Sequence, residues 1–272
     1  MSQPLAQAIG EIEKRLRSAG RLSLFLDFDG TLVPLGPDPS AIRLDPATRE
    51  TINRLSRRES IVTTVISGRA IDDLYMRVGH VEGIVYAGNH GLQIFGRGMY
   101  FVEPTAAARR SELRRMSSTL VEKLKPFMGA FVEFKGLTTA IHFRITPEKN
   151  VQQISTVVRN MIATNPEWFQ LKSGSKVLEI VPRTNWNKGA AVRWINRRLG
   201  DGEILSIYFG DDTTDEDAFR ELPDSITVKV GDPAGTLARY QAPDPDAVHD
   251  FLLWLTDCEV SRSAGALNTK KQ

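Results

Sequence analysis

The sequence predicts an α/β fold: a Rossmann-like core domain with a parallel sheet, into which a smaller α+β domain is inserted. Two changes of pattern along the chain predict it. From residue 22 to about 95, apolar runs alternate with helical stretches, as in the βαβ units of a parallel sheet. From about 105 to 182 the order becomes helix, two strands, helix, two strands, and after 185 the first alternation returns.

The strands of the parallel part are predicted from short apolar runs with almost no charge, which are typical of strands buried on both faces. One run begins at residue 24, and others span 61–66, 84–87 and 204–209. Helical patterns occupy 45–59, 70–78, 190–199 and about 246–255, and residues 1–21 have the pattern of a charged amphipathic helix.

The inserted part is predicted to contain two helices, 106–125 and 148–164, and two strand pairs, 130–135 with 139–145 and 169–173 with 176–181. Turns are expected at 136–138 and 174–175, where glycine occurs. Successive strand residues point to opposite faces, so this sheet should be open-faced, with one apolar face packed on the helices. The other face carries Glu133, Lys135, His142, Arg144 and Glu179, and it is either solvated or turned toward a ligand.

These patterns set the expected domain boundaries. The core domain comprises 1–104 and 183–260, and the inserted domain comprises 105–182. The tail, 261–272, is small, polar and basic, and we expect it to be disordered.

Composition excludes several classes of protein. The 272 residues are 41% hydrophobic and 25% charged, as in ordinary globular proteins, and the net charge is only +2. The basic pairs Arg109-Arg110 and Arg114-Arg115 lie in a helical pattern that predicts a solvated face, not a nucleic-acid site. Cys258 is the single cysteine, so no intramolecular disulfide forms. With no signal-peptide pattern and no apolar run near the ~18 residues of a membrane span, we expect a cytoplasmic protein without membrane contact.

The first chemical motif follows the apolar run that begins at Leu24. Asp27 and Asp29 are separated by one residue, and Gly30 then allows a sharp turn. Two carboxylates at the end of a buried strand are costly unless a cation neutralises them. Because ligands of open α/β sheets bind at the carboxyl ends of the strands, the motif predicts a metal and an anionic substrate at one place.

Other predicted strands end in complementary groups. The strand 204–209 is followed by Asp211 and Asp212, which would add oxygen ligands of the kind Mg²⁺ prefers. The strand 61–66 is followed by Ser67 and Arg69, a hydroxyl and a guanidinium that suit phosphate oxygens. Lys188 opens a predicted helix and supplies a further positive charge.

The order of these motifs resembles the four motifs of haloacid-dehalogenase-type phosphatases, over residues 22–255. The motifs are Asp27-x-Asp29-Gly30-Thr31, Ser67, Lys188 and Gly210-Asp211-Asp212. Finer features are similar to the trehalose-6-phosphate phosphatase family: Ser67-Gly68-Arg69, Gly88-Asn89-His90-Gly91, Glu133-Phe134-Lys135, Glu179-Ile180-Val181-Pro182, Asn187-Lys188-Gly189 and Gly210-Asp211-Asp212-Thr213-Thr214-Asp215-Glu216.

The resemblance implies a Mg²⁺-dependent phosphatase that converts trehalose 6-phosphate to trehalose and phosphate beneath a mobile cap. Asp27 would attack phosphorus and form an aspartyl-phosphate, and Asp29 would protonate the leaving sugar and then activate water. The Mg²⁺ ligands would be Asp27, the main-chain carbonyl of Asp29 and Asp211, with Asp212 or Asp215 close by.

The resemblance also assigns the groups that hold the substrate. Gly30 and Thr31 would give main-chain N–H groups to the phosphate, and Ser67, Gly68 and Lys188 would complete its site. The remaining substrate contacts would come from Arg69, Asn89, His90, Glu133, Lys135, Arg144 and Glu179. For His90, an ordinary loop histidine is an equally good interpretation.

Three other functions compete with this hypothesis. Phosphatases with the same type of cap that act on glucosylglycerol phosphate or mannosyl-phosphoglycerate share the core motifs. A phosphoacceptor signalling module also uses clustered aspartates, but it needs neither an aspartate placed like Asp29 nor an inserted cap. A sensor without activity would be expected to lack Asp27 or Asp29. The substrate is expected to come from a separate trehalose-6-phosphate synthase, because the chain has no room for a fused glycosyltransferase domain.

Overall fold

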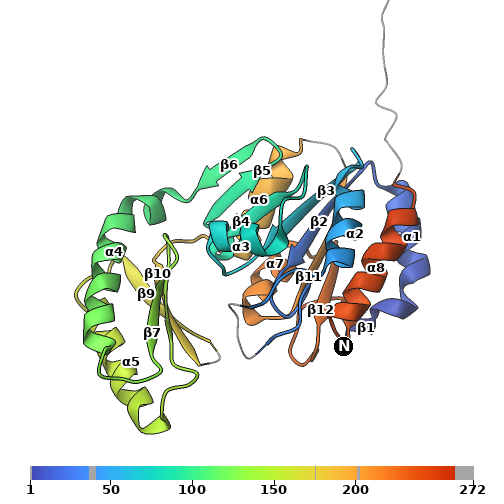
Figure 1. Ribbon diagram of the computed structural model, residues 1–272. Helices are drawn as coiled ribbons and strands as arrows, with labels where there is room; N and C mark the ends of the chain where they lie inside the picture. The colour runs from blue at the N-terminus through green and yellow to red at the C-terminus, as the bar shows by residue number, and fades with distance from the viewer. Residues whose placement is uncertain (1, 37–40, 175, 201–202, 261–272) are drawn as a thin grey trace, which may run out of the picture.

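The computed structural model describes residues 2–36, 41–174, 176–200 and 203–260, whose strands form two separate sheets (Figure 1). The larger sheet has nine strands among these residues. Their order is β1 (Gln3–Pro4), β13 (Tyr240–Ala242), β12 (Ile226–Val230), β11 (Ile204–Gly210), β2 (Arg21–Asp27), β3 (Ile61–Ile66), β4 (Val85–Gly88), β5 (Gln93–Gly96) and β6 (Met99–Val102). Neighbouring strands from β1 to β4 run parallel, and β5 and β6 extend the sheet as an antiparallel hairpin.

Helices cover both faces of this sheet, as the alternation of buried side chains along β2 requires. Leu22, Leu24 and Leu26 pack with α1 (Ile9–Ser18), α2 (Pro46–Ser56), α3 (Ile71–Val78) and α8 (Pro245–Asp257). Phe25 lies on the other face, with α6 (Lys188–Arg198) and α7 (Glu216–Glu221). The centre of the sheet is therefore covered on both faces by buried apolar side chains.

Residues 104–182, which we call the cap segment, connect β6 to the loop before α6 and carry the second sheet. Its elements are α4 (Pro104–Leu124), β7 (Phe131–Phe134), β8 (Thr139–His142), α5 (Glu148–Ile162), β9 (Phe169–Gly174) and β10 (Val177–Pro182). The strand order is β7-β8-β10-β9, all antiparallel, so the two hairpins join through β8 and β10. Both helices pack on one face of this sheet, around Ile141, Leu178 and Ile180. This arrangement confirms the predicted fold class, although the exact domain boundaries stay a prediction.

Two local predictions differ from the structure, and one hairpin was not predicted. The strand expected at 139–145 ends at His142, because His142 is the last residue with partners on both sides, Phe131 and Val177. Residues 143–146 turn instead, with the Thr146 N–H donating to the Phe143 carbonyl at 3.2 Å. Ile145, expected on the apolar face, is therefore exposed.

The N-terminal prediction was also only partly correct. Residues 1–21 were expected to form one helix, but α1 occupies only Ile9–Ser18, and β1 and a 3₁₀ turn (Leu5–Gln7) precede it. Strand β1 pairs with β13, more than 230 residues away in the chain, and local pattern cannot reveal such a pairing.

The hairpin β5–β6 was not predicted, although the Gly96-Arg97-Gly98 turn is a local signal for it. The predicted tail, 261–272, and Ser175 of the predicted turn lie outside the described residues. No helix within the described ranges is long and apolar enough to cross a membrane.

Gly91 tests how closely the turn after β4 packs against α6. Its φ is +86°, and an added Cβ would lie 2.4 Å from the Cβ of Ala191 in α6. Gly98 also has positive φ (+74°), but nothing lies within 4 Å of its Cβ position. We expect Gly98→Ala to lower the free energy of unfolding by about 1 kcal/mol, the cost of the left-handed backbone alone. Gly91→Ala should cost about 2–4 kcal/mol, because steric overlap adds to the same backbone cost.

Urea denaturation of the wild type and the two variants measures this difference. Equal losses for Gly91→Ala and Gly98→Ala would contradict the tight contact between Gly91 and α6.

Candidate active site

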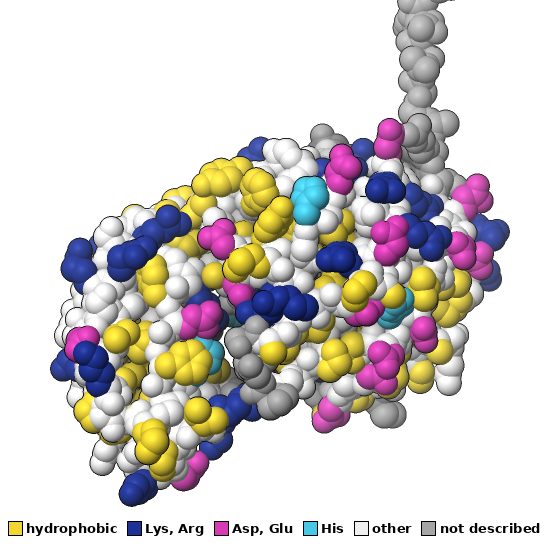
Figure 2. All heavy atoms as spheres, viewed as in Figure 1, with side chains coloured by type: hydrophobic (Ala, Val, Ile, Leu, Met, Phe, Trp, Pro, Cys, Tyr) yellow, Lys and Arg dark blue, Asp and Glu magenta, His cyan; other side chains and the backbone are white. Residues whose placement is uncertain are grey.

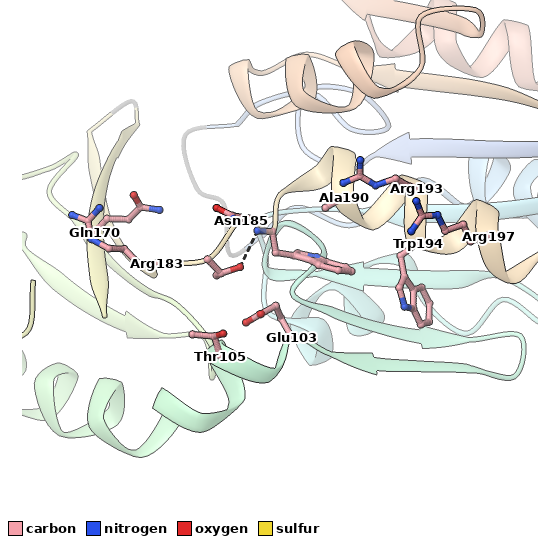
Figure 3. Close-up of a pocket in the computed structure, with 11 residues that line it drawn as sticks. Glu103, Thr105, Gln170, Arg183, Asn185, Ala190, Arg193, Trp194 and Arg197 are labelled. Atoms are coloured by element: carbon pink, nitrogen blue, oxygen red, sulfur yellow. Dashed lines mark hydrogen bonds between the residues drawn. The ribbon is translucent and has the colours of Figure 1, made fainter. Parts of the chain in front are cut away.

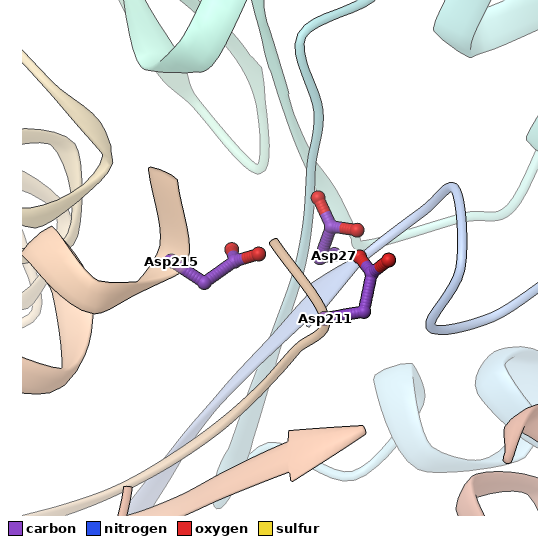
Figure 4. A group of neighbouring side chains, drawn as sticks. All are labelled: Asp27, Asp211 and Asp215. Atoms are coloured by element: carbon purple, nitrogen blue, oxygen red, sulfur yellow. The ribbon is translucent and has the colours of Figure 1, made fainter. Parts of the chain in front are cut away.

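The candidate site lies at the carboxyl ends of β2 and β11, the two central strands of the large sheet. Asp27 is the last residue of β2, and Asp211 directly follows Gly210, the last residue of β11. The strands are parallel neighbours, so both carboxylates lie at the same edge of the sheet. Figure 4 shows Asp27, Asp211 and Asp215 converging there from three backbone segments, and one ligand oxygen of each lies within 4.8 Å of the others.

Lys188 is the cation that holds this site together. It is the first residue of α6, is only 2% exposed, and donates to Asp27 Oδ1 at 2.6 Å and to Asp215 Oδ1 at 2.7 Å. Burial opposes its charge, but Asp215 and Asp27 outweigh burial, so the pKa of Lys188 is raised. The lysine therefore remains charged in the folded protein and fixes both carboxylates.

Asp215 is a structural anchor as well as a member of this cluster. It is fully buried and also accepts a hydrogen bond from the Tyr208 hydroxyl at 2.6 Å and from the Asp212 N–H at 3.0 Å. Gly210 makes room for it, since a Cβ at this position would lie 2.3 Å from the Asp215 carboxyl carbon. The loop after β11 is thus folded around the Asp215 side chain.

Because Asp211 adds a third carboxylate, the cluster carries more negative charge than Lys188 can neutralise. Its Oδ1 is buried and has no hydrogen-bond partner within the described parts of the chain. Burial, followed by the charge of Asp215, raises the pKa of Asp211 from 3.8 to about 6. Burial likewise raises the pKa of Asp27, although Lys188 opposes the shift. An orphaned carboxylate oxygen beside two other buried carboxylates is a donor set that suits a hard divalent cation.

Gly30 allows Asp211 to reach this position. Its φ is +82°, and a Cβ there would lie 2.0 Å from Asp211 Oδ2. The N–H of Gly30 donates to the Val33 carbonyl at 2.8 Å, so in this structure that predicted phosphate donor is engaged within its own turn. Thr31, which follows, is fully buried, and its hydroxyl has no partner among the described residues.

The structure brings Asp215, and not Asp212, into the carboxylate cluster. Asp212 is exposed, and its carboxylate caps the 3₁₀ turn Thr213–Asp215 by accepting from the Thr213 N–H at 2.7 Å. The role of Asp212 as a metal ligand stays a prediction. In this structure its carboxylate is hydrogen-bonded within the loop after β11.

Asp29 is held by an arginine fork. Arg69 donates from Nε to Asp29 Oδ2 at 2.7 Å and from Nη2 to Oδ1 at 2.6 Å. Its Nη1 donates to Asp73 Oδ2 at 2.9 Å, and Arg77 Nε donates to the same oxygen at 2.6 Å. Asp73 and Arg77 lie one turn apart on α3, so this helix fixes the guanidinium that faces Asp29.

Ser67 follows the carboxyl end of β3, next to β2. It is 1% exposed, and its hydroxyl accepts from the Arg69 N–H at 3.2 Å. Gly68 lies close to His90, whose Cε1 would be 2.6 Å from a Cβ at this position. The predicted phosphate residues of the β3 loop thus lie directly against the loop after β4.

Residues of the cap segment contact the core through charged and polar groups. Glu179 on β10 accepts from Lys135 Nζ at 3.2 Å and from the Thr138 hydroxyl at 2.9 Å, and its Oε2 lies 3.2 Å from His90 Nε2. Burial opposes the charge of Glu179, but Lys135, His90 and Thr138 outweigh it and lower the pKa of Glu179. Lys135 also donates to the Gly68 carbonyl at 3.1 Å, so predicted sugar-binding residues here hold the cap segment to the core.

Asn89 completes this contact. It is fully buried and donates to the Lys135 carbonyl at 3.2 Å. Its Oδ1 lies 3.1 Å from the Thr138 hydroxyl and shares the single hydrogen of that hydroxyl with Glu179. Asn89 and His90 both have positive φ, +51° and +58°, a backbone conformation that is uncommon outside glycine and is often found at functional sites.

The other predicted residues of the polar sheet face are more open. Glu133 is paired with His142 at 2.8 Å, and this hydrogen bond is the main reason that the pKa of Glu133 is lowered. Arg144 lies beyond the end of β8, is exposed, and is not on the strand face where it was expected. In the space-filling view, acidic, basic and histidine side chains meet where the two parts of the molecule adjoin (Figure 2).

Sequence reasoning missed four residues of these networks: Asp73, Arg77, Thr138 and Tyr208. Asp73 lies four residues after Arg69 at the start of a predicted helix, a spacing that could have revealed the pair. Thr138 lies in a hairpin turn and Tyr208 in a buried strand, so nothing local distinguishes them from ordinary turn and core residues.

A buried lysine that joins carboxylates from two neighbouring strand ends, on a parallel sheet with an inserted cap segment, defines the haloacid-dehalogenase-like class of phosphatases. The trehalose-phosphatase family model matches residues 25–234, which is more than half of the chain. The chain belongs to the trehalose-phosphatase family.

Relatives and solved structures agree with this assignment. The chain is 34% identical over 258 residues to a probable trehalose-phosphate phosphatase of Oryza sativa subsp. japonica, covering 91% of this chain and 69% of the relative. It is 34% identical over 239 residues to the trehalose-phosphate phosphatase of Mycobacterium tuberculosis, covering 84% and 60%.

Two solved structures share the fold at lower identity. A trehalose-6-phosphate phosphatase related protein superposes with a TM-score of 0.76 at 23% identity, covering 86% of this chain and 96% of that one. The C-terminal domain of Candida albicans trehalose-6-phosphate phosphatase gives 0.74 at 20% identity, covering 94% and 98%. At these identities the likeness concerns the fold alone.

The raised pKa of Asp211 predicts a pH-dependent stability of the metal-free protein. Between about pH 4 and 6 the folded state binds more protons at Asp211 than the unfolded state, so the contribution of Asp211 to the free energy of unfolding falls as pH rises. The loss is complete above about pH 6 and amounts to at most about 3 kcal/mol. Asp211→Asn removes this ionisation, so in a chelator at pH 7 we expect the variant to be more stable than the wild type.

Urea denaturation in a chelator at pH 4 and pH 7 measures the effect, with Asp212→Asn as the matched control at the exposed neighbour. If the wild type and Asp211→Asn lost stability in parallel between the two pH values, burial of the Asp211 charge would not be the cause.

Proposed function

We propose that this protein hydrolyses trehalose 6-phosphate to trehalose and inorganic phosphate, with Asp27 as the nucleophile. The observation that carries the proposal is the pair of contacts from Lys188 to Asp27 and Asp215, in a chain that belongs to the trehalose-phosphatase family. A carboxylate fixed by a buried cation at the end of a rigid strand keeps its position while a phosphoryl group approaches.

In the proposed reaction, an oxygen of Asp27 forms a bond to phosphorus while the bond from phosphorus to the sugar oxygen breaks. The product is an aspartyl-phosphate and trehalose, and water then cleaves the acyl-phosphate to restore Asp27. Lys188 holds the carboxylate in line and offsets part of its charge, which reduces repulsion of the anionic phosphoryl group.

Mg²⁺ is the proposed cofactor, and the donor set at the strand ends supports it. Asp27 and Asp211 would hold the ion, together with the main-chain carbonyl of Asp29. The Oδ1 atom of Asp211 has no hydrogen-bond partner among the described residues and is therefore free to bind a cation. When bound, Mg²⁺ neutralises charge on the carboxylates and on the phosphoryl oxygens.

Asp29 is the proposed general acid and base. A sugar alkoxide is a poor leaving group, so a proton from Asp29 lowers the barrier of the first step, and the carboxylate formed can accept a proton from water in the second. In this structure both Asp29 oxygens are bonded to Arg69. We infer that a bound substrate competes for the Arg69 guanidinium and releases Asp29 for proton transfer.

The remaining assignments follow from the same site. Ser67, Gly68 and the backbone of Gly30 and Thr31 would bind phosphoryl oxygens. The polar face of the cap segment would bind the sugar, with Glu133 its most open carboxylate, since Glu179 and Lys135 are already engaged with the core. A trehalose-6-phosphate synthase that supplies the substrate stays a predicted partner.

Phosphate release from a panel of substrates tests the proposed function. We expect trehalose 6-phosphate to be hydrolysed with a kcat/KM at least tenfold above glucosylglycerol phosphate, mannosyl-phosphoglycerate and glucose 6-phosphate. Turnover should stop in a chelator and return with Mg²⁺, and Asp27→Asn should lower kcat by at least about a thousandfold, since no nucleophile remains. Full activity in excess chelator, or preference for another glycosyl phosphate, would contradict the proposal.

Asp29→Asn distinguishes the general acid role of Asp29 from the nucleophilic role of Asp27. We expect kcat on trehalose 6-phosphate to fall about a hundred- to ten-thousandfold, because proton transfer to the leaving group is lost. With an aryl phosphate, whose leaving group needs no proton, phosphorylation of Asp27 should change little, as a pre-steady-state burst would show. If Asp29→Asn lowered the rate of the aryl phosphate burst as much as kcat on trehalose 6-phosphate, Asp29 would not be the general acid of the first step.

Glu133→Gln tests the sugar contact on the cap segment. A charge-assisted hydrogen bond lost from the sugar should lower kcat/KM for trehalose 6-phosphate about ten- to a hundredfold, without a change for a small aryl phosphate. Glu148→Gln is the matched control. Glu148 is the first residue of α5 in the cap segment, and its exposed carboxylate is paired with Lys176. If Glu133→Gln and Glu148→Gln behaved alike, the polar face would be only a solvated surface.

A further inference from the structure

A cavity of about 740 Å³ lies at the junction of the core and the cap segment, apart from the carboxylate cluster. Neither Asp27, Asp211 nor Lys188 lines it. Its walls include both connections between the two parts: Glu103 at the start of α4 and residues 183–186 before α6. We call this space the junction cavity; its volume is in the range of pockets that bind small molecules.

One face of α6 forms a wall of the junction cavity. Ala190, Arg193, Trp194 and Arg197 follow the spacing of a single helix face, and all four line the space. Arg193 and Arg197 are one turn apart, so two positive charges lie side by side on this face, and Glu221 neutralises that of Arg193 alone among the described residues. Figure 3 shows both guanidinium groups along α6, with Arg183 on the opposite side of the cavity.

The three arginines retain donors for a ligand. Arg193 uses Nη1 for Glu221, at 3.0 Å and 3.1 Å, and Arg183 uses Nε for the Pro166 carbonyl at 2.8 Å. Arg197 has no ion-pair partner among the residues that the structure describes. A guanidinium carries five N–H donors in a planar fork, so each arginine still offers donors that match phosphate oxygens.

Among the described residues of the walls, the one carboxylate, Glu103, already has a hydrogen-bond partner. Glu103 is 8% exposed, and its Oε2 accepts from the Ala106 N–H at 2.6 Å as the cap of α4. The lining therefore has a net positive charge, with the indoles of Trp186 and Trp194 as its large nonpolar surface. Cationic forks beside aromatic rings are suited to a ligand that combines phosphate with an organic group.

We propose that the junction cavity is a second ligand site, which binds a phosphorylated small molecule separately from the carboxylate cluster. An occupant would lie against both connections to the cap segment. It would also contact Trp186, whose Nε1 donates to the Gly91 carbonyl at 2.7 Å and which precedes Lys188 by two residues. The site is thus placed to sense or bias the position of the cap segment, whichever sugar phosphate the protein hydrolyses.

Calorimetric titration of the full chain in a chelator tests the proposal, with inorganic pyrophosphate as the phosphate probe and ADP as the probe that adds a planar ring. We expect one bound probe per chain. The double variant Arg193→Gln/Arg197→Gln should weaken binding at least tenfold, and Arg183→Gln, on the opposite wall, should weaken it about tenfold by itself. Arg220→Gln, an exposed arginine on α7 that does not line the cavity, should leave Kd unchanged.

Ser67→Ala separates the junction cavity from the active site. We expect this variant to bind both probes as the wild type does. Binding that is lost in Ser67→Ala but kept in the arginine variants would place the probe in the active site and overturn the proposal. Absence of binding to the wild type at millimolar probe would overturn it as well. If the double variant fails to fold, Arg183→Gln alone decides.

Discussion

The contacts of Lys188 with Asp27 and Asp215 are the interaction on which the rest of the site depends. A buried ammonium between two buried carboxylates is tolerated only when all three are fixed by hydrogen bonds, since each charge alone would be costly in the interior. Helix α6 supplies the lysine, β2 supplies Asp27 and the loop after β11 supplies Asp215. One triad thus ties three distant segments into a single strand-end site.

The triad also explains the unusual electrostatics around it. Lys188 balances one of the two carboxylates that it contacts, and Asp211 adds a further, partly buried carboxylate. One oxygen of Asp211 has no hydrogen-bond partner among the described residues. The surplus negative charge raises the pKa of Asp211 and makes the site receptive to a divalent cation. The same surplus is the reason that we expect the metal-free protein to lose stability as Asp211 ionises, and it supports the proposal of a bound cation.

A second polar network holds the cap segment to the core. Glu179, Lys135 and Thr138 of the cap segment meet His90, Asn89 and Gly68 of the core, and nearly all of these groups are partners of one another. The side chains that are expected to bind sugar therefore have an alternative set of partners within the protein. If these side chains bind the sugar as proposed, substrate binding and cap attachment would use the same charges, and the two events would be coupled.

The sequence by itself determined the fold class, the strands that carry Asp27 and Asp211, and the helix–hairpin–helix–hairpin order of the cap segment, because each depends on local periodicity and on acidic residues at strand ends. Only the tertiary structure decided that Asp215, and not Asp212, joins the cluster, that Asp29 is held by Arg69, and that β8 ends at His142. The tertiary structure also decided that β1 pairs with β13 and that the buried Tyr208 hydroxyl donates to Asp215. These features depend on pairing partners and on the side of a loop that faces inward, and such long-range contacts leave no signal in the spacing of neighbouring residues.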